Sequence, residues 1–302
     1  MNKPLKGKED HVNLAVLLTC ITFLFFTGID TSAKWLITAG MAVPVIVFFR
    51  YSGHLVFTVL SSVLQRDWTV WRMQRPGLTL LRGMLLVAST SLNFISLQYL
   101  PLTVTVSIFF TMPLMTTAIA AIFLKEQVGV RRWSAIAVGF CGVLIITQPW
   151  SASFHWAMLV SLFVTFMATI YNVLTRVLAG QESAGTMQFY AAALPCVLLA
   201  PWAFSQWTWP EGTLNWAVCL AIGFLGFAGH QIWVLALRLG EASALAPFGY
   251  VQIIYMTAAS WLIFNQPPGV WTMVGACVVV ASGMYVWVRE QALQIRKSHR
   301  AP

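Results

Sequence analysis

Residues 96–130 read SLQYLPLTVTVSIFFTMPLMTTAIAAIFLKEQVGV, and they align without a gap with residues 236–270, ALRLGEASALAPFGYVQIIYMTAASWLIFNQPPGV. Few residues are identical, but the apolar runs and the breaks between them coincide. A similar offset of about 140 residues places TGIDTSAKWL, residues 27–36, over TIYNVLTRVL, residues 169–178. The chain is therefore predicted to consist of two similar halves.

The composition indicates a membrane protein. Of the 302 residues 59% are hydrophobic and only 9% are charged, and the mean hydropathy is +0.76, far above the range of soluble domains. A membrane-spanning helix needs roughly 20 apolar residues, and the turn signals QYLP, QPWSAS and NQPPG divide the long apolar runs. The predicted spans are residues 12–33, 42–64, 77–97, 102–124, 133–149, 154–177, 186–206, 214–237, 243–264 and 270–288.

The number of spans in each half has a topological consequence. Because five is odd, the second half enters the membrane from the opposite side, so the halves form inverted repeats. We expect an all-α membrane protein with ten transmembrane helices in two inverted five-helix repeats. The expected divisions are an N-terminal tail (1–11), a first repeat (12–149), a second repeat (154–288) and a C-terminal tail (289–302). Two similar halves of this kind suit transport by alternating access.

The basic residues predict the orientation. Of the 18 Lys and Arg residues, 15 fall in the termini and loops of one side, and Lys34 belongs to the other. Both termini are therefore predicted to be cytoplasmic. The same distribution over six segments explains the pI near 9.6 without a nucleic-acid partner. Arg50 and Arg82 fall inside spans, and we assign Arg82, near a helix end, to the membrane interface.

No cofactor or metal is expected. The five cysteines all lie within predicted spans, without CxxC or metal-ligand spacing. The expected partners are membrane lipid and a small-molecule substrate, and no pattern in the chain specifies an oligomeric state.

A polar cluster inside the eighth span marks the candidate substrate site. Residues 226–233 read GFAGHQIW, and their Gly229, His230, Gln231 and Trp233 align with Ser89, Thr90, Ser91 and Asn93 of the third span. Buried polar groups need partners, so these clusters line a shared cavity or bond between helices. Deeper aromatic and amide residues of spans six and nine would suit a planar or amphipathic ligand. The candidate substrate-binding residues are Arg50, Ser89, Asn93, Tyr171, Asn172, His230, Gln231, Trp233, Tyr250, Gln252 and Tyr255.

Charged residues within spans have a functional or a paired role. Asp30 and Arg50 lie at similar depths, and we expect them to form an ion pair. In one interpretation this pair is a gate that never contacts substrate. In the other, Arg50 binds an anionic or carboxylate group, and Asp30 holds Arg50 when the site is empty.

Two other classes of function remain as alternatives. An intramembrane enzyme needs a converging set of nucleophile, base or metal ligands, but the spans contain no HExxH, no GxSxG and no carboxylate pair. A membrane scaffold would explain the helices but not the aligned polar clusters. Without a GxxxxGK[ST] motif, transport would be secondary, driven by a solute or ion gradient.

The motifs resemble a known family. LQYLP (97–101), TMPLMTTAIAAIFLKEQV (111–128), GFCGVLI (139–145) and EASALAPFGYVQ (241–252) are similar to EamA-type ten-helix transporters of the drug/metabolite transporter superfamily. RRWSAIAVGF and APFGY resemble members taken to carry S-adenosylmethionine or riboflavin. The resemblance implies a multi-pass protein of the bacterial inner membrane that carries an amino-acid-like, S-adenosylmethionine-like or flavin-like metabolite. Asn265 and Gln266 replace the family's acidic residue near the end of helix nine, which argues against ion coupling there.

Overall fold

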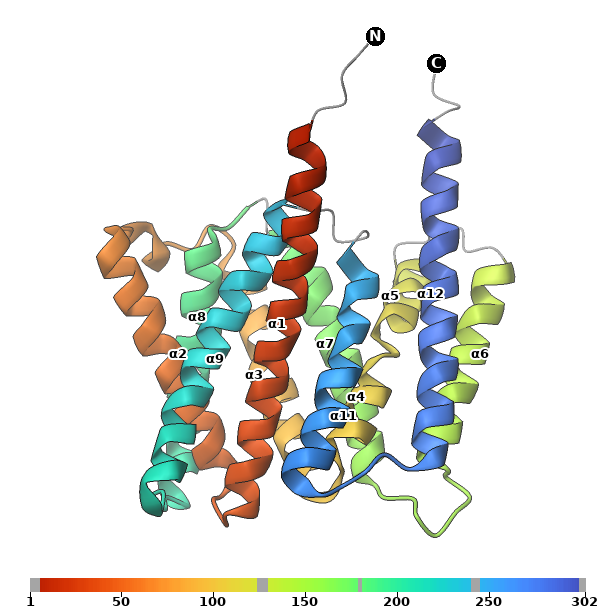
Figure 1. Cartoon of the computed structure of the whole chain (residues 1–302). Coiled ribbons are helices and arrows are strands. Elements are labelled where there is room, and N and C mark those ends of the chain that lie inside the picture. Colours follow the sequence, from red (N-terminus) through yellow and green to blue (C-terminus); the bar gives the residue numbers. More distant parts are fainter. Residues whose placement is uncertain (1–5, 124–129, 179–180, 240–244, 299–302) are drawn as a thin grey trace.

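A computed structural model describes residues 6–123, 130–178, 181–239 and 245–298, and within these ranges the chain forms helices and no strand (Figure 1). The helices of the first half are α1 (Lys6–Thr38), α2 (Val43–Gln65), α3 (Pro76–Tyr99), α4 (Leu102–Phe109), α5 (Met112–Phe123) and α6 (Val130–Thr147). Those of the second half are α7 (Ala157–Leu178), α8 (Ala184–Ser205), α9 (Gly212–Leu239), α11 (Val251–Phe264) and α12 (Val270–Ser298). Two short 3-10 helices, η1 (Trp68–Trp71) and η2 (Ala246–Tyr250), precede α3 and α11.

The helices confirm the predicted membrane fold. In the described ranges eight helices are long and apolar enough to cross a membrane, and Leu102–Thr116 and Trp133–Thr147 are two shorter apolar segments. Together they account for the ten predicted spans. Backbone groups in hydrocarbon must be satisfied within the protein, and helices do so locally.

The fourth predicted span, residues 102–124, is wrong as a single helix. It breaks between α4 and α5, where Pro113 lacks the N–H that a continuous helix would donate to the carbonyl of residue 109. The ninth span changes from η2 to α11 at Tyr250, which the repeat alignment places over Phe110. The rings of Phe110 and Tyr250 are in contact, with centroids 5.0 Å apart. Aligned spans from the two halves therefore both depart from regular α-helix near the same point, and they meet there.

The two halves run in opposite directions. In Figure 1 the start of α1 and the end of α12 lie on one side, which we call the terminal side. From this side α1 runs away, and α7 runs towards it from the loop on the opposite side. Packing follows the alignment: α1 lies along α9 and its counterpart α7 along α3, while α2 packs against α8 and α6 against α12. The bundle is therefore built from contacts between the halves.

Glycine permits two of these contacts to be very close. A Cβ atom on Gly53 of α2 would lie 2.8 Å from the Cα of Gly223 on α9. A Cβ atom on Gly142 of α6 would lie 2.9 Å from the carbonyl oxygen of Gly275 on α12. Small residues let helix backbones approach in this way in membranes, where dispersion and polar contacts replace the hydrophobic driving force.

Charged side chains from other elements bind both ends of α3. Glu182, which is 6% exposed, accepts hydrogen bonds through Oε1 from the backbone N–H groups of Gln74 (2.7 Å) and Arg75 (2.5 Å) at the helix start. Lys34 Nζ, which is 4% exposed, donates to the carbonyls of Leu97 (3.3 Å) and Leu100 (2.5 Å) at the helix end. An anion at the N-terminus and a cation at the C-terminus both stabilise a helix, because each interacts favourably with the helix dipole.

The loop that leads into α3 contains a further cap outside the membrane spans. Asp67 Oδ1 accepts hydrogen bonds from the hydroxyl (2.6 Å) and the backbone N–H (3.0 Å) of Thr69 at the start of η1. These bonds hold the pKa of the exposed Asp67 carboxyl below its ordinary value, because they stabilise its charged form.

Candidate functional site

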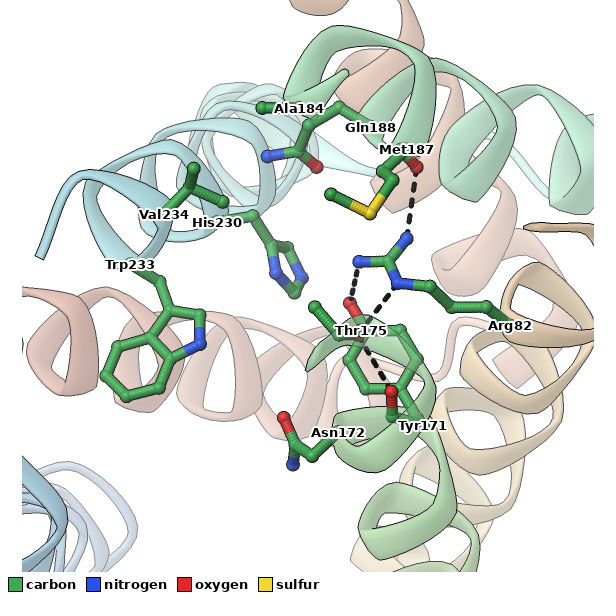
Figure 2. Close-up of a pocket in the computed structure, with 10 residues that line it drawn as sticks. All are labelled: Arg82, Tyr171, Asn172, Thr175, Ala184, Met187, Gln188, His230, Trp233 and Val234. Carbon is green, nitrogen blue, oxygen red and sulfur yellow. Dashed lines mark hydrogen bonds between the residues drawn. The ribbon is translucent and has the colours of Figure 1, made fainter. Parts of the chain in front are cut away.

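A small cavity with both polar and apolar lining residues lies among α3, α7, α8 and α9. It measures about 30 Å³ as space open to the centre of a water molecule, which is room for one or two waters. Figure 2 shows the side chains around it. The lining residues are Arg82, Tyr171, Asn172, Thr175, Ala184, Met187, Gln188, His230, Trp233 and Val234.

Helical spacing gathers these residues. On α8 the lining positions are 184, 187 and 188, and on α9 they are 230, 233 and 234, so both sets follow the i, i+3, i+4 pattern of one helix face. Arg82 follows the start of α3 by six residues and His230 precedes the end of α9 by nine. At 1.5 Å per residue the cavity lies roughly 9 to 14 Å from the terminal-side helix ends.

Arg82 is the buried cation of the cavity. Its Nε donates to Thr175 Oγ1 (2.8 Å), Nη1 to the carbonyl of Met187 (3.1 Å) and Nη2 to the hydroxyl of Tyr171 (2.6 Å). The guanidinium also lies over the Tyr171 ring, 4.5 Å from its centroid. The assignment of Arg82 to the membrane interface is therefore wrong: the side chain is 5% exposed, because acceptors on α7 and α8 draw it into the bundle.

Two imidazoles lie beside each other at the inner end of the cavity. His230 is stacked on His54 of α2, with ring centroids 5.8 Å apart and planes inclined by 24°, and Phe26 of α1 contacts the other side of His230 at 5.2 Å. His54 Nε2 and Gln188 Nε2 are buried without a hydrogen-bond partner. The site therefore contains buried polar atoms that could form further hydrogen bonds with a ligand or water.

Asn172 and Trp233, both predicted, line the cavity as well. Asn172 Nδ2 lies 3.2 Å from the sulfur of Met112, and the Trp233 ring contacts Phe23 of α1 at 6.0 Å. In Figure 2 the two side chains lie on the same side of the hollow, opposite Gln188 and Met187.

A second polar group lies on the opposite side of the bundle. Arg50 Nη1 donates to Thr90 Oγ1 at 2.7 Å, the Tyr51 hydroxyl lies 2.8 Å from the same oxygen, and Asn93 Nδ2 donates to Asp30 Oδ1 at 3.0 Å. The direct ion pair expected between Asp30 and Arg50 is absent from the described contacts. Asn93 and Thr90, one turn apart on α3, bind the two charges separately.

The other predicted residues lie away from the cavity. Ser89 bonds to the backbone of its own helix at 3.0 Å, and Gln231 and Tyr255 are half-buried outside the lining. Gln252 Oε1 and the Tyr250 hydroxyl are buried without partners, at the contact between the halves. The structure thus gathers four predicted residues at the cavity and two more, Arg50 and Asn93, in the opposite polar group.

Sequence reasoning missed Arg82 and Gln188 as lining residues. A signal existed for both, because an arginine and an amide inside apolar runs need buried partners. The sequence contains no such signal for Ala184, Met187 and Val234, because these side chains are ordinary within a membrane helix.

These features define a multi-pass helical membrane protein with a polar cavity where its two halves meet. The chain belongs to the EamA-like transporter family, whose model matches residues 13–148 and again residues 155–288. It is thus a multi-pass bacterial membrane protein of a metabolite transporter class and not an enzyme.

Named relatives extend over nearly the whole chain. An S-adenosylmethionine uptake transporter of Rickettsia bellii is 28% identical over 271 residues, covering 89% of this chain and 91% of the relative. A riboflavin transporter of Vibrio cholerae is 29% identical over 275 residues, covering 84% and 92%. A solved crystal structure superposes with a TM-score of 0.62 at 15% identity, covering 90% of this chain and 98% of the other, which shows a shared fold.

Proposed function

We propose that this protein is a secondary transporter that moves a small organic metabolite by alternating access. Its halves, residues 12–149 and 154–288, would rock against each other and expose a central site to each side in turn. The substrate would be amino-acid-like, S-adenosylmethionine-like or flavin-like, in agreement with the names of the relatives.

The observation that carries the proposal is a difference between the two sides of the bundle. The repeat alignment assigns to cavity residues Arg82, Tyr171, Thr175 and Met187 the counterparts Ile222, Ile29, Ala33 and Val47. These four counterparts are between 0% and 3% exposed. Aligned positions therefore form a cavity on the terminal side, whereas these four apolar counterparts are packed on the opposite side, as expected for one state of an alternating transporter.

Contacts between α6 and α12 support the proposal that the two halves turn about a common axis. Ser282 donates a hydrogen bond to the carbonyl of Ala135, and Gly142 approaches the carbonyl of Gly275. The alignment pairs Ala135 with Gly275 and Gly142 with Ser282, so these two contacts are equivalent. Two arrangements of such a bundle would differ little in free energy, which alternating access requires.

The distribution of basic residues supports a cytoplasmic terminal side. Both described chain ends lie on one side of the bundle, and the loops and termini of that side contain most of the Lys and Arg residues. In this orientation the cavity lies nearer the cytoplasm and the packed surface nearer the exterior.

A cavity of about 30 Å³ is much smaller than the roughly 300 to 1,000 Å³ of a typical ligand site, so binding requires the helices to separate. The experiment is counterflow of radiolabelled S-adenosylmethionine, riboflavin and amino acids into liposomes containing the purified protein. We expect one class to exchange. Trp233→Ala, which removes the cavity wall, should slow exchange strongly, while Trp209→Ala on the exposed surface should not. No exchange of any class would refute the proposal and favour a scaffold.

A further inference from the structure

Among the residues that the structure describes, no acidic side chain forms an ion pair with Arg82. Its three hydrogen bonds go to a threonine hydroxyl, a tyrosine hydroxyl and a backbone carbonyl, all of them neutral. The cavity lining contains no Asp or Glu. A buried charge without a counter-ion is costly, and in the described structure neutral dipoles alone offset that cost.

Two acidic side chains inside the bundle form their described hydrogen bonds elsewhere. Asp30 accepts a hydrogen bond from Asn93, next to Arg50 on the opposite side of the bundle. Glu182 accepts from Gln74 and Arg75 at the start of α3. Neither carboxylate lines the cavity, so the local charge is positive whenever the site is empty.

The unused donors of the cavity match an anion with two oxygens. A guanidinium has five N–H groups, and Arg82 uses one on Nε, one on Nη1 and one on Nη2. One N–H therefore remains on each terminal nitrogen, and charged N–H donors of this kind bind carboxylate or phosphate oxygens strongly. Gln188 Nε2, also in the lining, is buried without an acceptor.

The remaining lining would accommodate the body of such a ligand. Trp233 presents a flat ring across the hollow from Arg82, and Asn172 lies beside it (Figure 2). A planar group can stack on the indole while hydrogen-bonding to the amide. One end of the site thus suits an oxyanion and the other a ring.

We propose that the transported metabolite bears an anionic group, a carboxylate or a phosphate, which binds Arg82, and a planar body that packs on Trp233. This inference rests on the proposed transport function and narrows its substrate class. It favours a substrate that carries a carboxylate or a phosphate over neutral riboflavin. The anionic group of the substrate neutralises the Arg82 charge, for which the cavity lining contains no acidic side chain. Substrate binding therefore offsets the free-energy cost of burying Arg82.

Two matched ligand pairs test the anion directly in the unmodified protein. S-adenosylmethionine is compared with its carboxyl methyl ester, and flavin mononucleotide with riboflavin, by equilibrium binding to the purified protein. For the pair that binds, the member with the free carboxylate or phosphate should bind about 30-fold or more tightly than its partner, as for other buried charge pairs. The first pair reports on a carboxylate and the second on a phosphate. Equal affinity within the pair would overturn the inference.

Variants locate the effect at Arg82. Arg82→Gln should reduce the preference for the anion to less than about threefold, and Arg82→Lys, which retains the charge but not the fork, should keep part of it. Arg72→Gln removes an exposed arginine of the same side and should leave the preference unchanged. A preference that survives in Arg82→Gln would also overturn the inference.

The flux assay separates this inference from the function on which it rests. Exchange of riboflavin or of the methyl ester at the wild-type rate of its anionic partner would refute the anionic substrate and leave transport established. Absence of binding and exchange for all four compounds, together with no exchange of amino acids, would overturn the transport proposal, and this inference with it.

Discussion

Replacing Lys34 by methionine should loosen the packed side of the bundle opposite the termini. Residue 101 is proline and has no N–H to donate to the carbonyl of Leu97, and Lys34 Nζ supplies that hydrogen bond together with one to Leu100. Nζ also lies 5.8 Å from the centre of the Phe264 ring. Lys34 thus joins α1, α3 and α11 at their ends.

The size of the effect follows from the atoms left unpaired. Methionine is similar in length but leaves two buried carbonyls without donors, at about 1 to 3 kcal/mol each. Removing a buried cation recovers part of this cost. We expect a net loss of about 2 kcal/mol in the closed arrangement, which corresponds to a roughly 30-fold shift towards an arrangement open on the side opposite the termini.

Thiol labelling measures this shift. In a protein without native cysteines, Val47→Cys places a thiol at a position that is 0% exposed on the closed side, and a membrane-impermeant maleimide is added from that side. Lys34→Met should accelerate labelling at Val47→Cys by tenfold or more. The control, Trp209→Cys, is at a 66% exposed position and should label rapidly whether Lys34 is replaced or not. An unchanged labelling rate at Val47→Cys would show that Lys34 does not stabilise the packed arrangement on this side.

Three further substitutions test other contacts. Gly142→Val should lower the free energy of unfolding in detergent by about 1 to 3 kcal/mol through overpacking, whereas Gly77→Ala, which meets open space, should change it little; equal melting temperatures would contradict the close contact. Glu182→Ala should cost about 1 to 3 kcal/mol by unpairing N–H groups at the start of α3, and the exposed Glu211→Ala provides the control in the same thermal assay. Arg50→Ala should weaken substrate binding far more than it lowers the yield of folded protein if Arg50 contacts substrate, and equal losses would indicate a purely structural clamp.

The sequence predicted the large-scale architecture because that architecture depends on averages. Apolar runs of membrane length and a shared pattern of breaks are properties of many residues together, so one misread position does not change them. The break at Thr111 was missed because a proline inside an apolar run indicates a bend, a helix start or close packing equally well. Its resemblance to the change at Tyr250 became clear only when the two spans were seen in contact.

The site was only partly predictable because rotation and pairing depend on the partners. His230 and Gln231 are adjacent and equally polar, yet only His230 lines the cavity, since about 100° of rotation separates neighbours on a helix. Arg82 was assigned to the interface from its distance to a helix end. The acceptors that turn it inward, Thr175 and Tyr171, are about 90 residues away in the chain.

The central claim is that aligned surfaces on the two sides open in turn. Cysteines at Val234, which lines the terminal-side cavity, and at Val47 on the packed side report the two states, each labelled from its own side of the membrane with and without a transported substrate. The account predicts opposite changes: whatever raises the labelling rate at one position lowers it at the other. Rates that rise and fall together, or a thiol at Val47 that stays unreactive while substrate crosses the membrane, would contradict it.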